Sequence, residues 1–153
     1  MACVICFSFT SISLTSAVAS ISSPKPVMPN IDKCRLVVDD AHISTYDKER
    51  TGKDYVKVKT WSECYLTQSS ATILLKIYKV DQKHGDKVVG VFNNYKKARS
   101  GKLVELKDAK ILCVNKNPTK YYGVAKAHVV IPGLGVFDKG ARSAISNTLN
   151  CGM

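Results

Sequence analysis

Hydrophobic and polar residues alternate along most of the chain after residue 33, with the period of two that is typical of β-strands. The alternation is clearest in residues 55–61, where valine and threonine alternate with lysine, and it recurs in residues 71–80 and 121–131. Residues 34–38 form a shorter segment of the same kind. Since no window of twelve residues shows a helical period, the pattern predicts an all-β fold of antiparallel strands.

Each long strand has one face that we expect to lie in the core. The inward positions are Val56, Val58, Thr60, Ile73, Leu75, Ile77, Gly123, Ala125, Ala127, Val129 and Ile131. Between the strands we predict a hairpin turn at residues 81–86, a basic loop at 93–101, a turn at 115–118 and a strand end at 132–135. A last strand is predicted within residues 143–149. About six to eight short strands joined by turns favour an antiparallel, immunoglobulin-like β-sandwich.

The first 24 residues carry no charged side chain and include an apolar run at residues 2–7. Ala17-Val18-Ala19 has the small-x-small form at which a signal peptidase cuts. We therefore expect a signal peptide at residues 1–19, a serine- and proline-rich linker at 20–31 and a single domain at 32–153. The basic residues that usually open a signal peptide are missing, so a buried apolar element of a cytosolic domain is the alternative. A transmembrane helix is not expected, because it needs about 20 mostly apolar residues.

The cysteines agree with export. Two of them lie in the predicted signal peptide, and the domain retains Cys34, Cys64, Cys113 and Cys151. An even number of cysteines in a short exported chain indicates disulfide bonds, and four cysteines allow three pairings among which the spacing does not choose. Zinc binding is the alternative, but zinc sites usually bring paired Cys-x-x-Cys spacing, which is missing here. We expect two disulfide bonds, no metal and no cofactor.

The formal net charge of +11 comes mostly from lysine, and residues 76–142 hold 15 basic and five acidic side chains. A strong positive excess favours encounter with polyanions, which outside a cell include anionic wall polymers, lipids and acidic polysaccharides. Arginine, the better bidentate ligand for phosphate, is scarce, so we expect no specific nucleic-acid binding. The alternative is that the lysines serve only solubility.

Two strand faces combine aromatic and basic side chains. Lys57, Lys59 and Trp61 share one face of the first strand, and the outward face of residues 121–131 carries Tyr122, Lys126 and His128. Mixed faces of this kind bind sugars or stack on bases. More often they are ordinary surface or half-buried sheet residues. These six residues are the candidate binding residues.

No catalytic constellation is evident in the sequence. His42 and Ser44 would project to the same side of an extended segment, but a bond from Ser44 or Thr45 to nearby backbone is the better explanation. A Gly-x-Ser-x-Gly elbow is missing, and Asp39 and Asp40 would point to opposite faces of a strand. We therefore expect a non-enzymatic protein.

The order of several motifs is distinctive: Cys34 followed by His42-Ile43-Ser44, residues 56–58 leading to Cys64, the apolar strand 73–78, Cys113, residues 122–132 and a terminal Cys151. This order resembles that of a group of small exported actinobacterial proteins of unassigned function. The resemblance implies export, a β-sandwich and disulfide bonds, but no activity. By analogy with sandwiches in general, it suggests Cys64 paired with Cys113 across the core and Cys34 paired with Cys151 between the two ends.

Together these observations predict a secreted, monomeric, non-enzymatic module that binds or adheres to an anionic extracellular surface. The expected partner is an anionic cell-wall polymer or an extracellular protein. The alternative function is that of a secreted effector, either a bacteriocin-like toxin or an inhibitor of an extracellular enzyme. An inhibitor would present residues 93–101 as its exposed loop.

Overall fold

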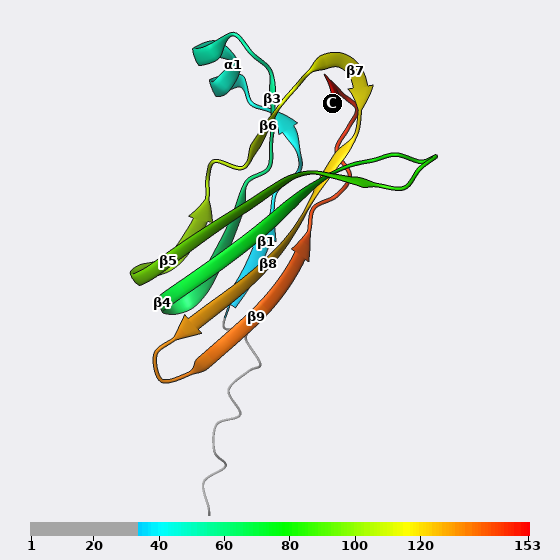
Figure 1. The fold of residues 1–153 in the computed structure, drawn as a ribbon. Coiled ribbons are helices and arrows are strands. Elements are labelled where there is room, and N and C mark those ends of the chain that lie inside the picture. The colour runs from blue at the N-terminus through cyan, green and yellow to red at the C-terminus, as the bar shows by residue number, and fades with distance from the viewer. Residues whose placement is uncertain (1–33) are drawn as a thin grey trace, which may run out of the picture. The chain divides into compact units, whose positions relative to one another are not determined.

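The computed structural model describes residues 34–153, and the predicted signal peptide and linker lie outside the described residues (Figure 1). The elements of the described chain are β1 (Cys34–Val38), β2 (His42–Ile43), α1 (Thr45–Thr51), β3 (Tyr55–Lys57), β4 (Thr60–Lys79), β5 (Lys87–Leu106), β6 (Lys110–Leu112), β7 (Asn115–Thr119), β8 (Tyr121–Ile131), β9 (Gly135–Arg142) and β10 (Leu149–Gly152). Strands dominate, so the prediction of an all-β fold is confirmed.

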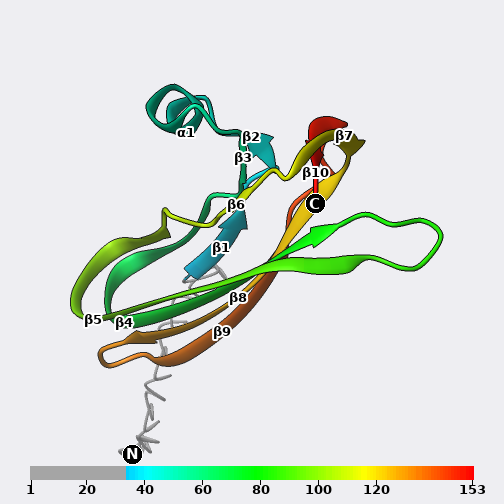
Figure 2. The ribbon, with the colours of Figure 1, turned by 45° about the horizontal axis from the view of Figure 1, so that its top comes forward.

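β4 is the central strand of the largest sheet. β5 runs antiparallel to it along one edge for almost its whole length. On the other edge, β1 pairs with residues 60–64 of β4 and β8 pairs with residues 70–79. β9 continues the sheet beyond β8. The register of β4 and β5 is broken between residues 63 and 70, and there the sheet curls, as Figures 1 and 2 show.

A buried amide stabilises this curled region. The Gln68 side chain is 0% exposed, and its Nε2 donates hydrogen bonds to the carbonyl oxygens of Ser62 (3.4 Å) and Lys102 (3.0 Å). The Ser62 hydroxyl donates to Oε1 of Gln68 at 3.4 Å. Because a buried amide without partners destabilises a fold, these bonds fix the path of β4 and β5 where their ladder is interrupted.

The inner face of the curled sheet holds the core, and the alternation predicted its residues correctly. The fully buried side chains of β4 and β8 include Ile73, Leu75, Ile77, Ala125 and Val129. β1 covers this face at Gly123, where an added Cβ would lie 2.8 Å from Cγ1 of Val38 and 2.8 Å from Cγ1 of Val58. A residue without a side chain is therefore needed at position 123 for β1 to pack so closely.

Both disulfide bonds join neighbouring segments, and the predicted pairing is wrong. Cys34 bonds to Cys64, and these two residues are direct register partners on β1 and β4 with Cα atoms 4.0 Å apart. Cys113, which follows β6, bonds to Cys151 of β10. The analogy with sandwiches placed the bonds across the core and between the chain ends. Adjacent antiparallel strands instead hold Cys34 and Cys64 directly opposite each other. The Cα atoms of Cys113 and Cys151 are 5.0 Å apart, which is within the roughly 7 Å that a disulfide requires.

Two smaller sheets and the only helix of the described chain lie beyond the large sheet. β3 pairs with both β2 and β6, and β7 pairs with β10. The helix α1 begins after Ser44, whose hydroxyl accepts a hydrogen bond from the backbone N–H of Asp47, and it ends at Gly52 in the left-handed conformation (φ 70°). This helix was not predicted, because seven residues are too few for a helical period to show. The capping bond confirms the interpretation that Ser44 bonds to nearby backbone.

Three predicted connections differ from the structure. Residues 93–101 lie in β5 rather than in a loop, because pairing with β4 continues through this polar segment. Residues 115–118 lie in β7, which pairs with β10, and not in a turn. Residues 143–148 form no strand, and two backbone hydrogen bonds from Ser143 and Ser146 tie them to the carbonyl oxygens of β8. β10 begins only at Leu149.

The strands predicted at 34–38 and 121–131 are confirmed residue for residue, as is a turn at 81–86 between two paired strands. That turn closes the long hairpin of β4 and β5, whose end extends away from the other strands in Figures 1 and 2. The immunoglobulin-like sandwich is not confirmed. The sheets are curled and antiparallel, and the sandwich arrangement stays a prediction.

Candidate functional site

Trp61 lies at the centre of a surface formed by β1, the first residues of β4 and the last residues of β5. Its register partners are Val37 on β1 and Glu105 on β5. Glu63 lies two residues further along β4 on the same face, and Lys59 lies two residues before Trp61, immediately ahead of the strand. A groove of about 610 Å³ runs over this surface, and it is lined by Asp39, Lys57, Lys59, Thr60, Trp61, Glu63, Leu103, Glu105, Leu106 and Lys107. We call it the Trp61 groove.

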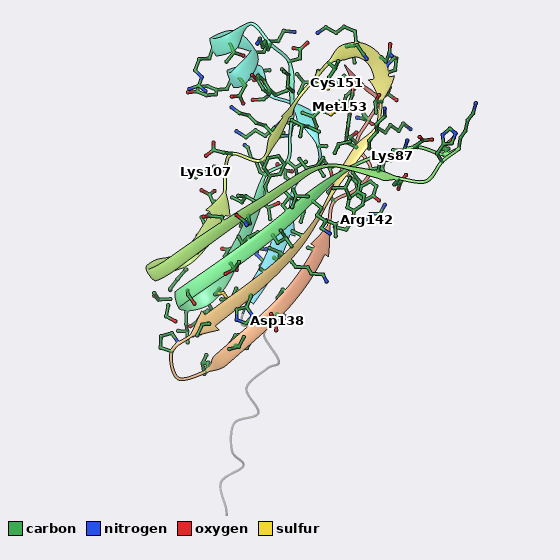
Figure 3. The ribbon with its side chains drawn as sticks, viewed as in Figure 1. Lys87, Lys107, Asp138, Arg142, Cys151 and Met153 are labelled. Atoms are coloured by element: carbon green, nitrogen blue, oxygen red, sulfur yellow. A yellow bond between two sulfur atoms is a disulfide. The ribbon has the colours of Figure 1, made fainter. Side chains whose placement is uncertain are left out.

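The groove contains acidic and basic groups in equal number. Nε of Arg35 donates to Oε2 of Glu63 at 2.8 Å, and Nζ of Lys107 lies 2.9 Å from Oε2 of Glu105. Lys107, labelled in Figure 3, follows the last residue of β5. Lys57 and Lys59 form no ion pair with any residue of the described chain. The structure brings together Lys57, Lys59 and Trp61, which the sequence singled out. The single strand predicted at residues 55–61 is wrong, however, because Lys57 ends β3, Lys59 lies between the two strands and Trp61 lies in β4, which belongs to a different sheet.

The outward face of β4, β8 and β9 carries a second set of basic residues, which the sequence identified only in part. Lys76, Val124 and Arg142 form one row across the three strands, and Lys126 lies in the next row. All three cations are exposed, and none forms an ion pair within the described part of the chain. From strand spacings, their backbone positions lie about 8–10 Å apart. We call Lys76, Lys126 and Arg142 the cationic triangle.

Lys76 and Arg142 were missed because they are separated by 66 positions in the sequence, and only the sheet register makes them neighbours. The alternation of residues 71–80 placed Lys76 on an outward face, but no strand was predicted at residues 135–142, so Arg142 was assigned to no face. Arg142 marks the end of β9 in Figure 3.

Tyr122 does not present a free ring for binding. It is 6% exposed and stacks on Tyr78 with ring centroids 5.0 Å apart and planes 2° from parallel. The guanidinium of Arg142 covers the ring at 4.0 Å from its centroid, and the hydroxyl donates to Oδ2 of Asp86 at 3.0 Å. Burial and the Asp86 carboxylate both raise the pKa of Tyr122. The ring thus anchors Arg142 and the base of the hairpin, so it supports the cationic triangle indirectly.

His128 lies on the same outward face as Lys126 and forms an ion pair with Asp138 of β9, with Nδ1 and Oδ1 2.8 Å apart. Both side chains are exposed, so the pair contributes little to stability. Thr72 is the register partner of His128 on β4. Among the described residues, the Thr72 hydroxyl forms no hydrogen bond with the imidazole ring of His128. Thr72, His128 and Asp138 therefore do not form a nucleophile activated by a base.

His42 and Ser44 do not form a catalytic pair either. Nδ1 of His42 lies 3.0 Å from the carbonyl oxygen of Asp40. The Ser44 hydroxyl donates instead to Oδ2 of Asp47 at 2.6 Å. Within residues 34–153, no group of three or more histidine, cysteine or acidic side chains is placed to hold a metal ion. In the same part of the chain, no helix is long and apolar enough to cross a membrane.

Comparison with known proteins assigns no family to this chain. No protein-family model matches the chain, and no curated protein matches it.

Proposed function

We propose that the protein is a non-enzymatic extracellular module that binds anionic cell-wall polymers through the cationic triangle. The observation that carries this proposal is the placement of Lys76, Lys126 and Arg142 on adjacent rows of one sheet face without carboxylate partners in the described chain. Three neighbouring positive charges produce a local field that favours a chain of regularly spaced negative groups. Asp138, an acidic residue of β9 on this face, is paired with His128, and Asp86 accepts a hydrogen bond from Tyr122.

Two features support an extracellular location. All four cysteines of the described chain form disulfide bonds, which persist in oxidising compartments. The uncharged N-terminal segment with its Ala17-Val18-Ala19 cleavage motif is consistent with export. The inhibitor hypothesis, by contrast, loses the segment on which it depended, because residues 93–101 belong to β5.

The experiment measures binding to purified poly(glycerol phosphate) teichoic acid, with uncharged dextran as the negative control. The test variant carries Lys76→Gln, Lys126→Gln and Arg142→Gln. The matched control carries Lys53→Gln, Lys83→Gln and Lys120→Gln, which removes the same charge from exposed lysines elsewhere. Each contact between one of these cations and a phosphate group contributes about 0.5–1 kcal/mol to binding. The test variant, which loses three such contacts, should therefore bind teichoic acid at least about tenfold more weakly.

We expect the wild-type affinity to fall as the salt concentration rises, because exposed charges are screened. The affinity of the control variant for teichoic acid should fall by no more than about threefold, because its substitutions change the long-range electrostatic field and remove no direct contact. Equal losses in both variants would show that net charge alone drives binding and would reject the triangle. Affinity that does not change with salt would reject the electrostatic proposal itself.

A further inference from the structure

The Trp61 groove differs from the cationic triangle in the chemistry that it offers. Around the half-buried indole, the neighbouring positions on β1, β4 and β5 supply both donors and acceptors. Among the lining residues, Lys57, Lys59 and Lys107 are balanced by Asp39, Glu63 and Glu105. A charge-balanced surface gives little attraction to a polyanion, so the groove does not extend the electrostatic site.

An aromatic platform with a mixed polar rim matches the two-sided chemistry of a pyranose ring. One face of the sugar presents C–H groups, which are apolar and slightly positive, and an indole face is apolar and slightly negative. The hydroxyl groups around the sugar ring each donate and accept hydrogen bonds, so they require both kinds of partner nearby. Lysine ammonium groups donate and carboxylates accept, and the groove holds both at the edge of one ring.

The ion pairs leave part of the carboxylate rim open. Two nitrogen atoms of Arg35 donate hydrogen bonds to the same oxygen of Glu63, Oε2, and Nζ of Lys107 contacts Oε2 of Glu105. Oε1 of each glutamate therefore has no hydrogen-bond donor from the described residues. Each pair also holds its carboxylate in place, which lowers the entropy cost of binding a ligand there.

From this arrangement we propose that the Trp61 groove is a binding site for an uncharged pyranose saccharide, with one sugar ring stacked on Trp61. The groove volume of about 610 Å³ is within the range of small-molecule sites. A second hollow of about 550 Å³ adjoins the groove, because both are lined by Glu105, Leu106 and Lys107. An oligosaccharide with one ring on Trp61 would therefore extend toward this second hollow.

The test uses a property of the chain itself, which contains one tryptophan. Fluorescence emission therefore reports on the centre of the proposed site without labelling. The full chain is titrated with N-acetylglucosamine tetrasaccharide, cellotetraose and mannotetraose. We expect a saturable change in emission with at least one of these oligosaccharides, and we expect high salt to leave it in place because the ligand is uncharged.

Variants locate the site when binding is measured by calorimetry. Trp61→Ala should weaken binding at least about tenfold, since it removes the stacking platform. Trp61→Tyr should retain most of the affinity, because it restores an aromatic face. Tyr65→Ala is the matched control, since Tyr65 is 74% exposed and lies outside the groove. Thermal unfolding of each variant verifies that it is folded.

The saccharide proposal is independent of the proposed function. The variant that lacks the cationic triangle should bind the oligosaccharide like the wild type, and Trp61→Ala should still bind teichoic acid. No saturable emission change with any of the three oligosaccharides at millimolar concentration would overturn the proposal. Undiminished binding by a folded Trp61→Ala protein would also overturn it, as would binding restricted to anionic sugars and abolished by salt.

Discussion

The phenolic hydroxyl of Tyr121 donates a hydrogen bond of 2.6 Å to the carbonyl oxygen of Cys151. Both residues are 0% exposed. The bond joins the first residue of β8, a strand of the large sheet, to β10 in a different sheet. Burial raises the pKa of Tyr121, so the hydroxyl stays protonated and remains a donor at physiological pH.

Replacing Tyr121 with phenylalanine should lower the free energy of unfolding by about 1–3 kcal/mol, because the carbonyl oxygen of Cys151 stays buried without its donor. Urea unfolding followed by circular dichroism measures this loss. Tyr46→Phe is the control, since Tyr46 is 64% exposed and should change stability by less than about 0.5 kcal/mol. Equal effects of the two substitutions would contradict a stabilising role for the bond.

Gly123→Ala should destabilise the domain by about 1–3 kcal/mol, because the new methyl group would overlap Val38 and Val58 and force β1 away from the sheet. Gly140→Ala provides the matched comparison on β9. A Cβ there would have no neighbour nearer than the carbonyl oxygen of Ala125 at 4.0 Å. Thermal and urea unfolding of both variants should therefore separate the steric effect from the general effect of replacing a strand glycine. A Gly123→Ala protein as stable as Gly140→Ala would refute the close approach of β1.

The two disulfide bonds predict which cross-linked peptides a digestion yields and how much stability is lost when a bond is removed. Digestion without reduction should yield Cys34 joined to Cys64 and Cys113 joined to Cys151. The two bonds close loops with sequence separations of 30 and 38 residues. In the chain-entropy model, replacing both cysteines of either bond with serine should cost about 3–4 kcal/mol of stability. A peptide containing Cys34 joined to Cys151 would contradict this framework.

Asp47 predicts how stability depends on pH. Hydrogen bonds from the side chains of Lys110 and Ser44 lower the pKa of this carboxyl below its ordinary value of 3.8, and burial only partly opposes them. A lowered folded-state pKa means that the carboxylate stabilises the fold above the unfolded-state pKa and that this contribution is lost as the pH falls through the folded-state value. Stability should therefore decrease on acidification below about pH 4.

Asp47→Asn should lower stability at neutral pH and weaken this acid dependence, because the amide cannot titrate. Urea midpoints measured between about pH 2 and pH 7 give the comparison. Asp138→Asn is the control, since it removes an exposed partner of His128 and should leave both the midpoint at neutral pH and the acid slope nearly unchanged. Parallel pH profiles for wild type and Asp47→Asn would contradict the role assigned to Asp47.

Strand positions were predictable where burial on one face sets the residue pattern. Residues 121–131 carry small or apolar residues on the inward face, while Lys126 and His128 lie among the outward residues, and β8 has those bounds. Residues 93–101 gave the opposite result, because their polar side chains indicate a loop while backbone pairing with β4 makes them a strand. Backbone hydrogen bonds depend on a partner strand elsewhere in the sequence, and the side chains of the segment itself do not reveal that partner.

The candidate sites show the same distinction. Lys57, Lys59 and Trp61 could be grouped because they alternate with buried residues along one segment, although that segment is divided between β3 and β4. The position of Glu105 at the rim of the Trp61 groove and that of Arg142 in the cationic triangle could not be predicted, because both depend on the register between strands. Tyr122 was correctly placed on the outward face, but its stacking on Tyr78 and its cover by Arg142 are visible only in three dimensions.

Within residues 34–153, the disulfide bonds close two rings, 34–64 and 113–151, which are joined by the open chain of residues 65–112. The rings neither overlap nor enclose each other, and the turn of the long hairpin lies in the open part between them. One peptide-bond cleavage in that turn would consequently divide the polypeptide into two separate molecules that only noncovalent contacts hold together. Under denaturing conditions they would come apart without any reducing agent, so the disulfide bonds that stiffen each half give the whole no protection against a single nick.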